Sequence, residues 1–155
     1  MGKEIERKFL VNNNAYKSLA EGVLYYQGFL STSKERVVRI RIVNEDAFLT
    51  IKGSSAGAKR TEFEYKIPVE EARIMLDEMC EKPIIIKHRY KVEVGNMVWE
   101  VDEFLEENKG LVIAEVELQD EYQELKLPKW VGKEVTNDPR YYNANLIKHP
   151  FNNWK

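Results

Sequence analysis

The chain has 155 residues, of which 43% are hydrophobic and 32% are charged. This length suits one domain over 1–155, and the hydrophobic share is too high for a disordered chain. The 24 Lys and Arg against 26 Asp and Glu leave a net charge of −2, so the chain as a whole has no electrostatic attraction to nucleic acid or to an anionic membrane. We therefore expect neither as a partner, and any basic site has to be local.

The N-terminal residues and the single cysteine bear on the cellular compartment. Charged residues at 1–8 stand where a signal peptide would need an apolar stretch, and no apolar run approaches the roughly 20 residues of a membrane span. Cys80 has no partner for an internal disulfide and lies on the apolar side of a helical pattern. We expect a packed thiol and a reduced, cytoplasmic location. The oligomeric state does not follow from the sequence.

Alternation of apolar and polar residues predicts eight strands, at 3–11, 23–30, 36–43, 47–53, 59–67, 84–94, 97–104 and 111–119. Helical spacing is less frequent and occurs at 13–21, 69–80, 121–127 and 141–148. Turns are expected at 44–46, 53–57, 95–96 and 107–110. Because short connections favour antiparallel pairing, we expect a mainly β (α+β) fold, an antiparallel meander with helices packed outside.

Nearly every predicted strand has one charged face. Residues two apart along a strand share a face, and here they form like-charged pairs such as Arg39 with Arg41 and Glu115 with Glu117. A simple solvated face is one interpretation, although it would accept uncharged polar residues equally well and like charges repel. The other is that the sheet closes into a barrel with this face inward, where bound ions supply the counter-charges.

The acidic side chains on this face form a set without Cys or His. They are Glu4, Glu6, Glu62, Glu64, Glu100, Asp102, Glu115 and Glu117. Oxygen ligands favour a hard cation such as Mg²⁺ or Mn²⁺, whereas zinc usually recruits Cys or His. His88 points with the apolar face of its strand, and His149 precedes a proline near the end of the chain. Neither is therefore an expected ligand.

The basic side chains on the same face suit a row of phosphates. They are Lys8, Arg39, Arg41, Lys52, Lys87 and Arg89, with Lys66 and Lys91 as outer candidates. Arginine offers a planar fork to phosphate oxygens and lysine a point charge. The chain has no nucleophile elbow, and the 53–57 segment lacks the Gly-Lys-Ser/Thr ending of a phosphate-binding loop. The two sets together predict a metal-bound polyphosphate site in which a metal-activated water attacks.

The order of these motifs resembles the CYTH or triphosphate tunnel metalloenzyme family, and its short bacterial members in particular. The family hallmark Glu-x-Glu-x-Lys reads Glu4-Ile-Glu6-Arg-Lys8 in this chain. Further family-like elements are Arg39-Ile-Arg41, Thr50-Ile-Lys52, Arg60-Thr-Glu62-Phe-Glu64, Lys87-His-Arg89, Glu100-Val-Asp102-Glu-Phe104, Glu115-Val-Glu117, residues 132–136, Tyr142-Asn143 and Leu146. The resemblance implies an eight-stranded antiparallel closed β-barrel, a tunnel with a charged lumen, and a C-terminal helix against one mouth.

The resemblance also implies a role for each matching residue. The bases that would bind the triphosphate are Lys8, Arg39, Arg41, Lys52, Lys87 and Arg89. The carboxylates that would hold a phosphate-bridging Mg²⁺ or Mn²⁺ are Glu4, Glu6, Glu115 and Glu117. Those that would lie near a second ion or orient the attacking water are Glu62, Glu64 and Asp102. In the second predicted strand Gln27-Gly28 resembles a family turn, and this uncharged strand receives no catalytic role.

We therefore expect a metal-dependent triphosphatase that cleaves inorganic tripolyphosphate to pyrophosphate and phosphate. Members of the resembled family also hydrolyse nucleoside or thiamine triphosphates or act as adenylate cyclases, so these activities stay open as alternatives. The lack of a recognisable base-binding element in the chain favours the inorganic substrate. A rival of another class is a non-catalytic binder of polyphosphate or nucleotide, which would need the bases but not all the carboxylates.

Overall fold

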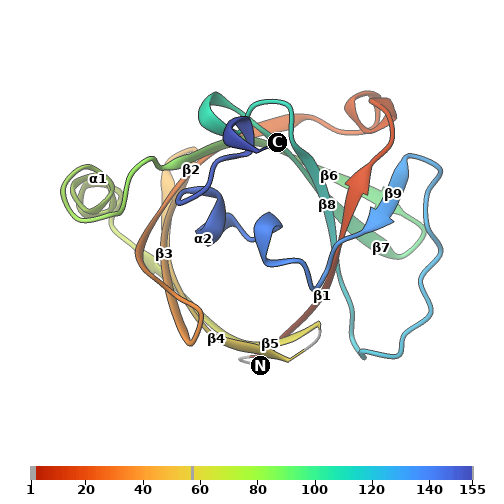
Figure 1. The fold of residues 1–155 in the computed structure, drawn as a ribbon, viewed down its shortest axis with the longest axis horizontal. Coiled ribbons are helices and arrows are strands. Elements are labelled where there is room, and N and C mark those ends of the chain that lie inside the picture. Colours follow the sequence, from red (N-terminus) through yellow and green to blue (C-terminus); the bar gives the residue numbers. More distant parts are fainter. Residues whose placement is uncertain (1–2, 57, 155) are drawn as a thin grey trace.

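The structure, a computed structural model, describes residues 3–56 and 58–154. These residues contain nine strands, eight of which form a ring (Figure 1). The strands are β1 (Lys3–Val11), β2 (Gly22–Ser33), β3 (Arg36–Val43), β4 (Asp46–Ala56), β5 (Lys59–Ile67), β6 (Ile85–Val94), β7 (Met97–Phe104), β8 (Val112–Glu117) and β9 (Val131–Glu134). The eight predicted strands are thus confirmed, and β9 is an addition.

The strands follow the hydrogen-bonded order β5-β4-β3-β2-β6-β7-β8-β1-β9, and β1 also pairs with β5. All of these pairings are antiparallel. Two meanders, β2 to β5 and β6 to β8, are joined by the β2–β6 pair on one side and by β1 on the other. The single meander expected from the sequence is therefore wrong, because tight turns determine only which strands form hairpins. Long-range neighbours such as β2 and β6 carry no such local signal.

Strand β1 completes the ring by changing partners along its length. Its first residues pair with β5, with Glu4 opposite Arg60. From Glu6 onward it pairs with β8, and near its end it also pairs with β9, where Val11 lies opposite Val131. The eight strands therefore form a ring whose β1–β5 junction is short.

The helices differ from the sequence predictions in extent. Helix α1 (Val69–Glu78) lies outside the ring as predicted, directly after Pro68. The 13–21 segment contains a 3₁₀ helix, η1, over Ala15–Ser18, and 121–127 is not helical. Helix α2 (Asn143–Leu146) lies within the outline of the ring in Figure 1 and packs against hydrophobic side chains at one end of the lumen. The C-terminal helix expected against one mouth is therefore present. Among the described residues, no helix is long and apolar enough to cross a membrane.

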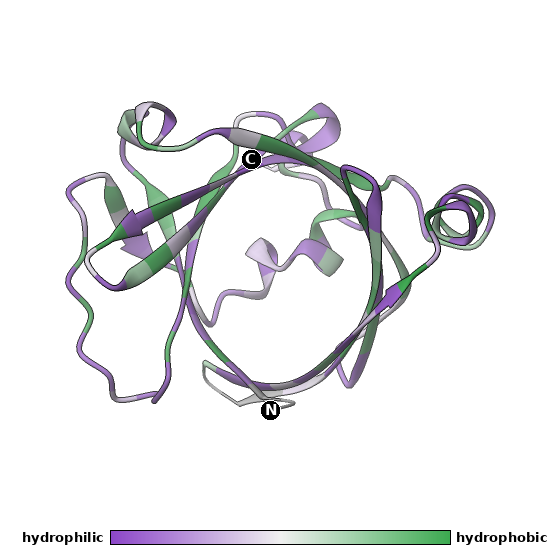
Figure 2. Ribbon diagram, turned by 180° about the vertical axis from the view of Figure 1, so that it is seen from behind, coloured by the Kyte–Doolittle hydropathy of each residue, from purple (hydrophilic) through white to green (hydrophobic). Residues whose placement is uncertain are grey.

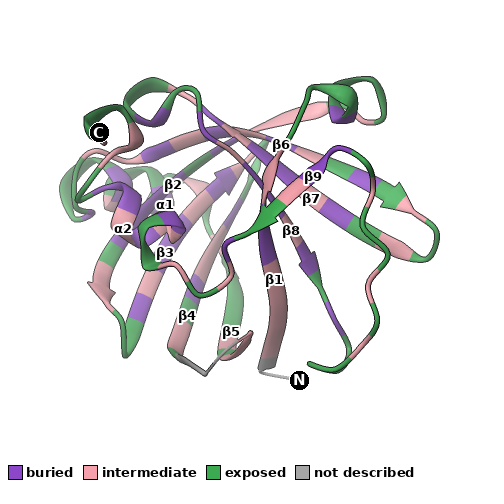
Figure 3. Cartoon of the chain, turned by 45° about the vertical axis from the view of Figure 1, so that its right-hand side comes forward, coloured by how far each residue is buried: buried purple, intermediate pink, exposed green. Residues whose placement is uncertain are grey.

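Hydrophobic and hydrophilic residues alternate along the strands (Figure 2), and buried residues are interspersed with exposed ones (Figure 3). On the outer face, Trp99 packs with Tyr16 of η1 and with Trp130. Under α1, Ile40 packs with Leu76 of the helix. The outer face therefore forms an apolar core where other elements cover it, whereas Phe63 and Tyr65 of β5 stay exposed.

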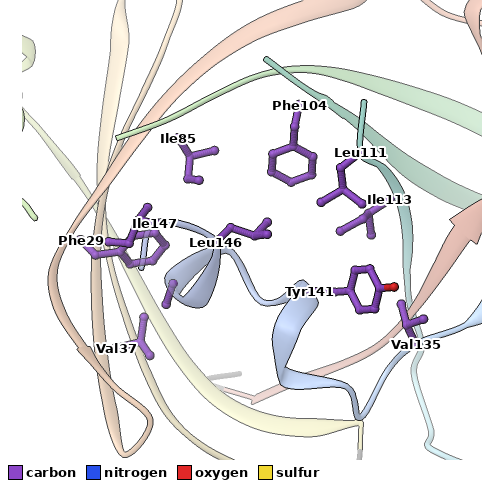
Figure 4. Packing of buried hydrophobic residues seen from close by; sticks show 11 residues of the cluster. Phe29, Val37, Ile85, Phe104, Leu111, Ile113, Val135, Tyr141, Leu146 and Ile147 are labelled. Carbon is purple, nitrogen blue, oxygen red and sulfur yellow. The ribbon is translucent and has the colours of Figure 1, made fainter. Parts of the chain in front are cut away.

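One end of the lumen is apolar. On six strands, a polar or charged residue that faces the lumen is followed or preceded, two positions away, by a hydrophobic residue on the same face. The pairs are Leu10 with Lys8, Phe29 with Gln27, Val37 with Arg39, Ile85 with Lys87, Phe104 with Asp102, and Ile113 with Glu115. Leu146 and Ile147 from the C-terminal segment pack among these hydrophobic side chains (Figure 4). We call this group the apolar end cluster. It explains why α2 enters the ring, because an apolar lumen end would otherwise face water.

The contact between α1 and β2 yields a stability prediction. Gly28 lies in the middle of β2, not in a turn, and a Cβ on it would approach Leu76 Cδ2 to 2.8 Å and Cys80 Cβ to 2.9 Å. Gly28→Ala should therefore lower the free energy of unfolding by about 1–3 kcal/mol, as overpacking does. A Cβ on Gly53 would lie 3.7 Å from Thr61 Cβ, so Gly53→Ala should change it by no more than about 0.5 kcal/mol. Urea unfolding of both variants measures this, and a parental midpoint for Gly28→Ala would contradict this packing.

Candidate active site

The polar part of the lumen contains a cavity of about 1130 Å³. All six predicted phosphate-binding residues line it, namely Lys8, Arg39, Arg41, Lys52, Lys87 and Arg89. Carboxylates of both predicted groups also line it, namely Glu4, Glu6, Glu62, Glu64, Glu115 and Glu117, as do Glu100 and Arg60. The fold thus gathers these charges on one surface, as expected if the charged face points inward.

Three residues singled out in the sequence lie elsewhere. Lys66 is exposed and pairs with Asp46 at 3.1 Å, and Lys91 is exposed on β6. Neither lines the cavity. Lys91 lies opposite the cavity-lining Glu100, and Lys66 lies two positions from the cavity-lining Glu64, so both share the inner face but lie beyond the cavity. Asp102 is on the inner face but is only 1% exposed, since Lys87 and Arg89 contact it, and it does not line the cavity either.

Register places charges of opposite sign across from each other on neighbouring strands. Lys8 lies opposite Glu115, and Lys52 opposite Glu62. The Lys52 Nζ atom is 3.2 Å from Glu4 Oε1 and 3.3 Å from Glu62 Oε1, and Lys8 Nζ is 3.5 Å from Glu115 Oε2. Opposite-charge pairs of this kind stabilise a sheet, so these ion pairs hold the lysines in the lumen before any ligand binds.

Asp102 anchors two of the bases. Its Oδ2 atom accepts from Lys87 Nζ at 2.6 Å, and its two oxygens accept from Arg89 Nε and Nη2 at 2.7 and 2.8 Å. Burial alone would raise the pKa of Asp102, but Arg89 and Lys87 hold it below its usual value. Burial lowers the pKa of Lys87 to about 7, although Asp102 opposes this shift. Because both oxygens are engaged by bases, these contacts favour a positioning role for Asp102.

The arginines leave donors available for an anion. Arg39 Nη2 donates to Thr50 Oγ1 at 3.1 Å, but the buried Arg39 Nε has no hydrogen-bond partner among the described residues. Arg41 has no carboxylate within ion-pair distance in the described part of the chain, and its Nε donates to Gln27 Oε1 at 3.0 Å. Burial and the neighbouring guanidinium groups, Arg89 for Arg39 and Arg39 for Arg41, lower the pKa values of both residues. An anionic oxygen would relieve this excess of positive charge.

The carboxylates divide into a paired and a crowded group. Burial by itself would raise the pKa of Glu115, but Lys8, a hydrogen bond with Glu6, and Arg89 hold it well below its usual value. Burial, Glu115 and Glu4 raise the pKa of Glu6 well above its usual value. Burial and neighbouring carboxylates also raise the pKa of Glu117, which lies opposite Glu6. The like-charge crowding expected at Glu115 and Glu117 thus falls on Glu6 and Glu117.

This crowded group has the chemistry that a hard divalent cation requires, because its donors are carboxylate oxygens and its charge lacks compensation. Among the described residues, no three Asp, Glu, His or Cys side chains are already close enough to hold a metal ion. The carboxylates would therefore share the ion with phosphate oxygens, or move together to bind it. In either case the donor set fits Mg²⁺ or Mn²⁺ better than a softer metal.

Two uncharged residues in this site carried no assigned role in the sequence. Gln27 Nε2 donates to Asn143 Oδ1 at 2.6 Å, and Lys87 Nζ donates to the same oxygen at 2.9 Å. A signal existed for Gln27, since a polar residue between the lumen-facing Tyr25 and Phe29 needs a partner when buried. Asn143 stood out only as part of the family-like element Tyr142-Asn143, and its contact with Gln27, which spans 116 positions, has no local signal.

Comparison with known proteins agrees with this geometry. A family model described as the CYTH domain matches residues 2–150. This chain belongs to the CYTH domain family. A relative named inorganic triphosphatase, from Acetivibrio thermocellus, is 57% identical over 155 residues, which cover 100% of this chain and 99% of the relative. A second protein of that name, from Nitrosomonas europaea, is 35% identical over 147 residues, or 92% of this chain and 95% of the relative.

Solved structures of CYTH-type proteins share the fold. The crystal structure of the inorganic triphosphatase NE1496 matches with a TM-score of 0.67 and 32% identity, and the match covers 93% of each chain. A putative adenylate cyclase from Bacillus halodurans matches with a TM-score of 0.61 over 78% of this chain and 84% of its own. Its 18% identity shows a common fold alone. The family resemblance inferred from the sequence motifs is therefore confirmed.

The division of the carboxylates predicts opposite effects of two similar substitutions. Without metal at neutral pH, Glu6→Gln should raise the free energy of unfolding by a few tenths to about 1 kcal/mol, because it removes like-charge repulsion. Glu115→Gln should lower it by about 1–3 kcal/mol, because Lys8 loses its charged partner. Calorimetry in a chelator measures both values, and equal shifts would contradict the division.

The pH dependence follows from the direction of the Glu6 shift. Its folded-state pKa is raised, so between the unfolded value of about 4.3 and the folded value the native state binds more protons than the unfolded state. This group therefore makes the metal-free protein less stable as the pH rises through that window. In Glu6→Gln this loss of stability should disappear. The free energy of unfolding is measured against pH for both proteins, and an equal slope in the variant and the parent would show that Glu6 does not titrate in this way.

Proposed function

We propose that this CYTH protein is a metal-dependent triphosphatase that hydrolyses inorganic tripolyphosphate to pyrophosphate and phosphate. The observation that carries the proposal is the convergence of six bases and at least six carboxylates on one cavity inside the ring. Two relatives named inorganic triphosphatase, at 57% and 35% identity, support it. We further propose that the domain over 1–155 carries this activity in the cytoplasm, where the buried thiol of Cys80 would stay reduced.

The bases would bind and align the phosphate chain. Arg41 lines the cavity and has no carboxylate partner among the described residues, so its guanidinium suits an anionic oxygen. Lys8, Lys52, Lys87 and Arg89 already have carboxylate partners, so these partners keep the side chains extended into the lumen. Preorganised donors of this kind lower the cost of binding and stabilise charge that develops during phosphoryl transfer.

The metal would be held by Glu4, Glu6, Glu115 and Glu117, as one or two Mg²⁺ or Mn²⁺ ions. When bound, such an ion supplies polarisation of a phosphoryl group and a water of lowered pKa. Glu62 and Glu64 keep 26% and 40% of their side chains exposed, which suits groups that orient the attacking water. For Asp102, which the family pattern would place in this second group, we propose instead that it orients Lys87 and Arg89.

The alternatives differ in substrate and in chemistry. A nucleoside or thiamine group would need space beside the phosphates, but the apolar end cluster fills one end of the lumen with buried side chains. A non-catalytic binder would need the bases without the carboxylates that surround them. We therefore retain organic triphosphates, adenylate cyclase activity and simple binding as outcomes of the test.

The deciding experiment is phosphate release from tripolyphosphate, pyrophosphate, ATP and thiamine triphosphate, each with Mg²⁺, with Mn²⁺ and in EDTA. We expect the highest kcat/KM for tripolyphosphate with metal, and no turnover after chelation. A higher kcat/KM for an organic triphosphate would replace the substrate assignment. Full turnover in EDTA would refute the metal requirement, and tight binding without hydrolysis would establish the binder.

Arg41 and Lys91 form a matched pair that tests whether the cavity-lining bases bind the substrate. Arg41 lines the cavity and Lys91 lies outside it. If Arg41 contacts phosphate through one or two charge-assisted hydrogen bonds of about 1.5–3 kcal/mol each, Arg41→Ala should lower kcat/KM tens- to thousands-fold. Lys91→Ala should stay within about twofold of the parent. Calorimetry verifies that both variants fold, and a parental kcat/KM for Arg41→Ala would rule out its contact with substrate.

A further inference from the structure

A continuous chain of hydrogen bonds connects Arg41 on β3 with Lys87 on β6 through two amide side chains. Arg41 Nε donates to Gln27 Oε1 at 3.0 Å, and Gln27 Nε2 donates to Asn143 Oδ1 at 2.6 Å. Lys87 Nζ completes the chain by donating to Asn143 Oδ1 at 2.9 Å. We call this chain the amide relay. It joins strands β3, β2 and β6 to helix α2.

The amide relay has one consistent orientation. A guanidinium and an ammonium can only donate hydrogen bonds, so the Gln27 oxygen has to face Arg41 and the Asn143 oxygen has to face Lys87. The Gln27 NH₂ group is then left to donate to that same Asn143 oxygen, as observed. Rotating either amide by 180° would set donor against donor. The charged ends therefore determine how both amides point.

The two amides occupy different positions relative to the cavity. Gln27 is fully buried and does not line the cavity, whereas Asn143, Arg41 and Lys87 do. Gln27 can therefore act on a ligand only through the residues that it holds. Arg41 has no carboxylate partner in the described residues and is repelled by Arg39. The hydrogen bond that it donates to Gln27 and the Tyr25 ring, whose centroid is 5.1 Å from Arg41 Cζ, therefore determine where its guanidinium lies.

Helix α2 is itself fixed by the apolar end cluster. Leu146 is 0% exposed and Ile147 is 3% exposed, and both pack among lumen-facing side chains (Figure 4). These two residues follow Asn143 within the same short segment, so their burial places the Asn143 amide against Lys87. The C-terminal segment thus fills the lumen end with its apolar side chains and reaches the charged site with a polar one.

We propose that Gln27 and Asn143 are positioning residues, which hold Arg41 and Lys87 in one arrangement toward the bound phosphate chain. The inference rests on the proposed function and deepens it, because it makes β2 and the C-terminal segment part of the phosphate site. The competing explanation is that both amides only satisfy buried polar groups and that Asn143 contributes packing to α2.

Two substitutions at Asn143 separate these explanations. Asn143→Leu has a similar size and removes the acceptor, whereas Asn143→Asp keeps an acceptor for Lys87 and Gln27. If the relay positions the bases, Asn143→Leu should lower kcat for tripolyphosphate about 10- to 100-fold. Asn143→Asp should recover most of kcat but raise KM, because its added charge repels the substrate. If Asn143 only packs, Leu next to an apolar cluster should serve at least as well as Asp, and that order of activities would overturn the proposal.

Two further variants control for damage to the fold. Asn152 lies in the same C-terminal segment but does not line the cavity, and its Nδ2 donates to Glu106 O at 3.1 Å, so Asn152→Leu should keep kcat and KM within about twofold of the parent. Gln27→Met approaches the relay from β2 and should lower kcat as Asn143→Leu does. Because Asn143→Leu and Gln27→Met each break the same amide relay, the double variant should have a kcat no lower than that of the slower single variant. Multiplied losses would show that the two amides act independently and would overturn the relay.

Binding of tripolyphosphate in EDTA, measured by titration calorimetry, distinguishes this inference from the proposed function. We expect the parent and Asn152→Leu to bind equally, and Asn143→Leu and Gln27→Met to bind about tenfold more weakly. A parent that binds without hydrolysing would refute the proposed function, yet the variants would still test the relay. Equal binding and equal kcat in all folded variants would overturn the inference while leaving the triphosphatase intact.

Discussion

The compensation of charge inside a water-poor lumen is the constraint on which the rest of this structure depends. Strand alternation brings bases and carboxylates to one inner surface, where an unpaired charge would cost several kcal/mol. The antiparallel register reduces this cost, because it places Lys8 opposite Glu115 and Arg89 opposite Asp102. Compensation is incomplete at Arg41, which has no carboxylate within ion-pair distance among the described residues, and at Glu6, where carboxylates crowd. These two deficits are opposite in sign, and they match the two components of a metal-bound phosphate chain.

The lumen-facing side chains change abruptly from polar to hydrophobic along the strands. Moving two residues along six of the strands replaces a polar or charged side chain by a hydrophobic one, and the C-terminal segment covers the hydrophobic end. The apolar end cluster therefore does more than close the ring. It fixes α2, and α2 presents Asn143 to the phosphate-binding bases. One short segment therefore both buries the hydrophobic end of the lumen and positions Asn143 at its centre.

Much of the fold and of the site was accessible from sequence pattern. Alternation with a period of two located eight strands and sorted their faces correctly, since the side-chain direction in a strand is a local property. All six predicted phosphate-binding bases line the cavity for that reason. The division among the carboxylates was not accessible, because it depends on cross-strand distances. Glu115 and Glu6 look equivalent in the sequence, but Lys8 and Arg89 neutralise the first while Glu115 and Glu4 crowd the second.

By itself, the sequence determined the strands, the inward charged face and the family, because each of these depends on residues a few positions apart or on the order of motifs. Only the tertiary structure decided that β1 lies between β5 and β8, that α2 enters the ring, and that Asp102 faces Lys87 and Arg89 instead of the cavity. The amide relay belongs to this second group. Gln27 and Asn143 are 116 positions apart, and their contact arises from packing of Leu146 in the lumen, which no local pattern encodes.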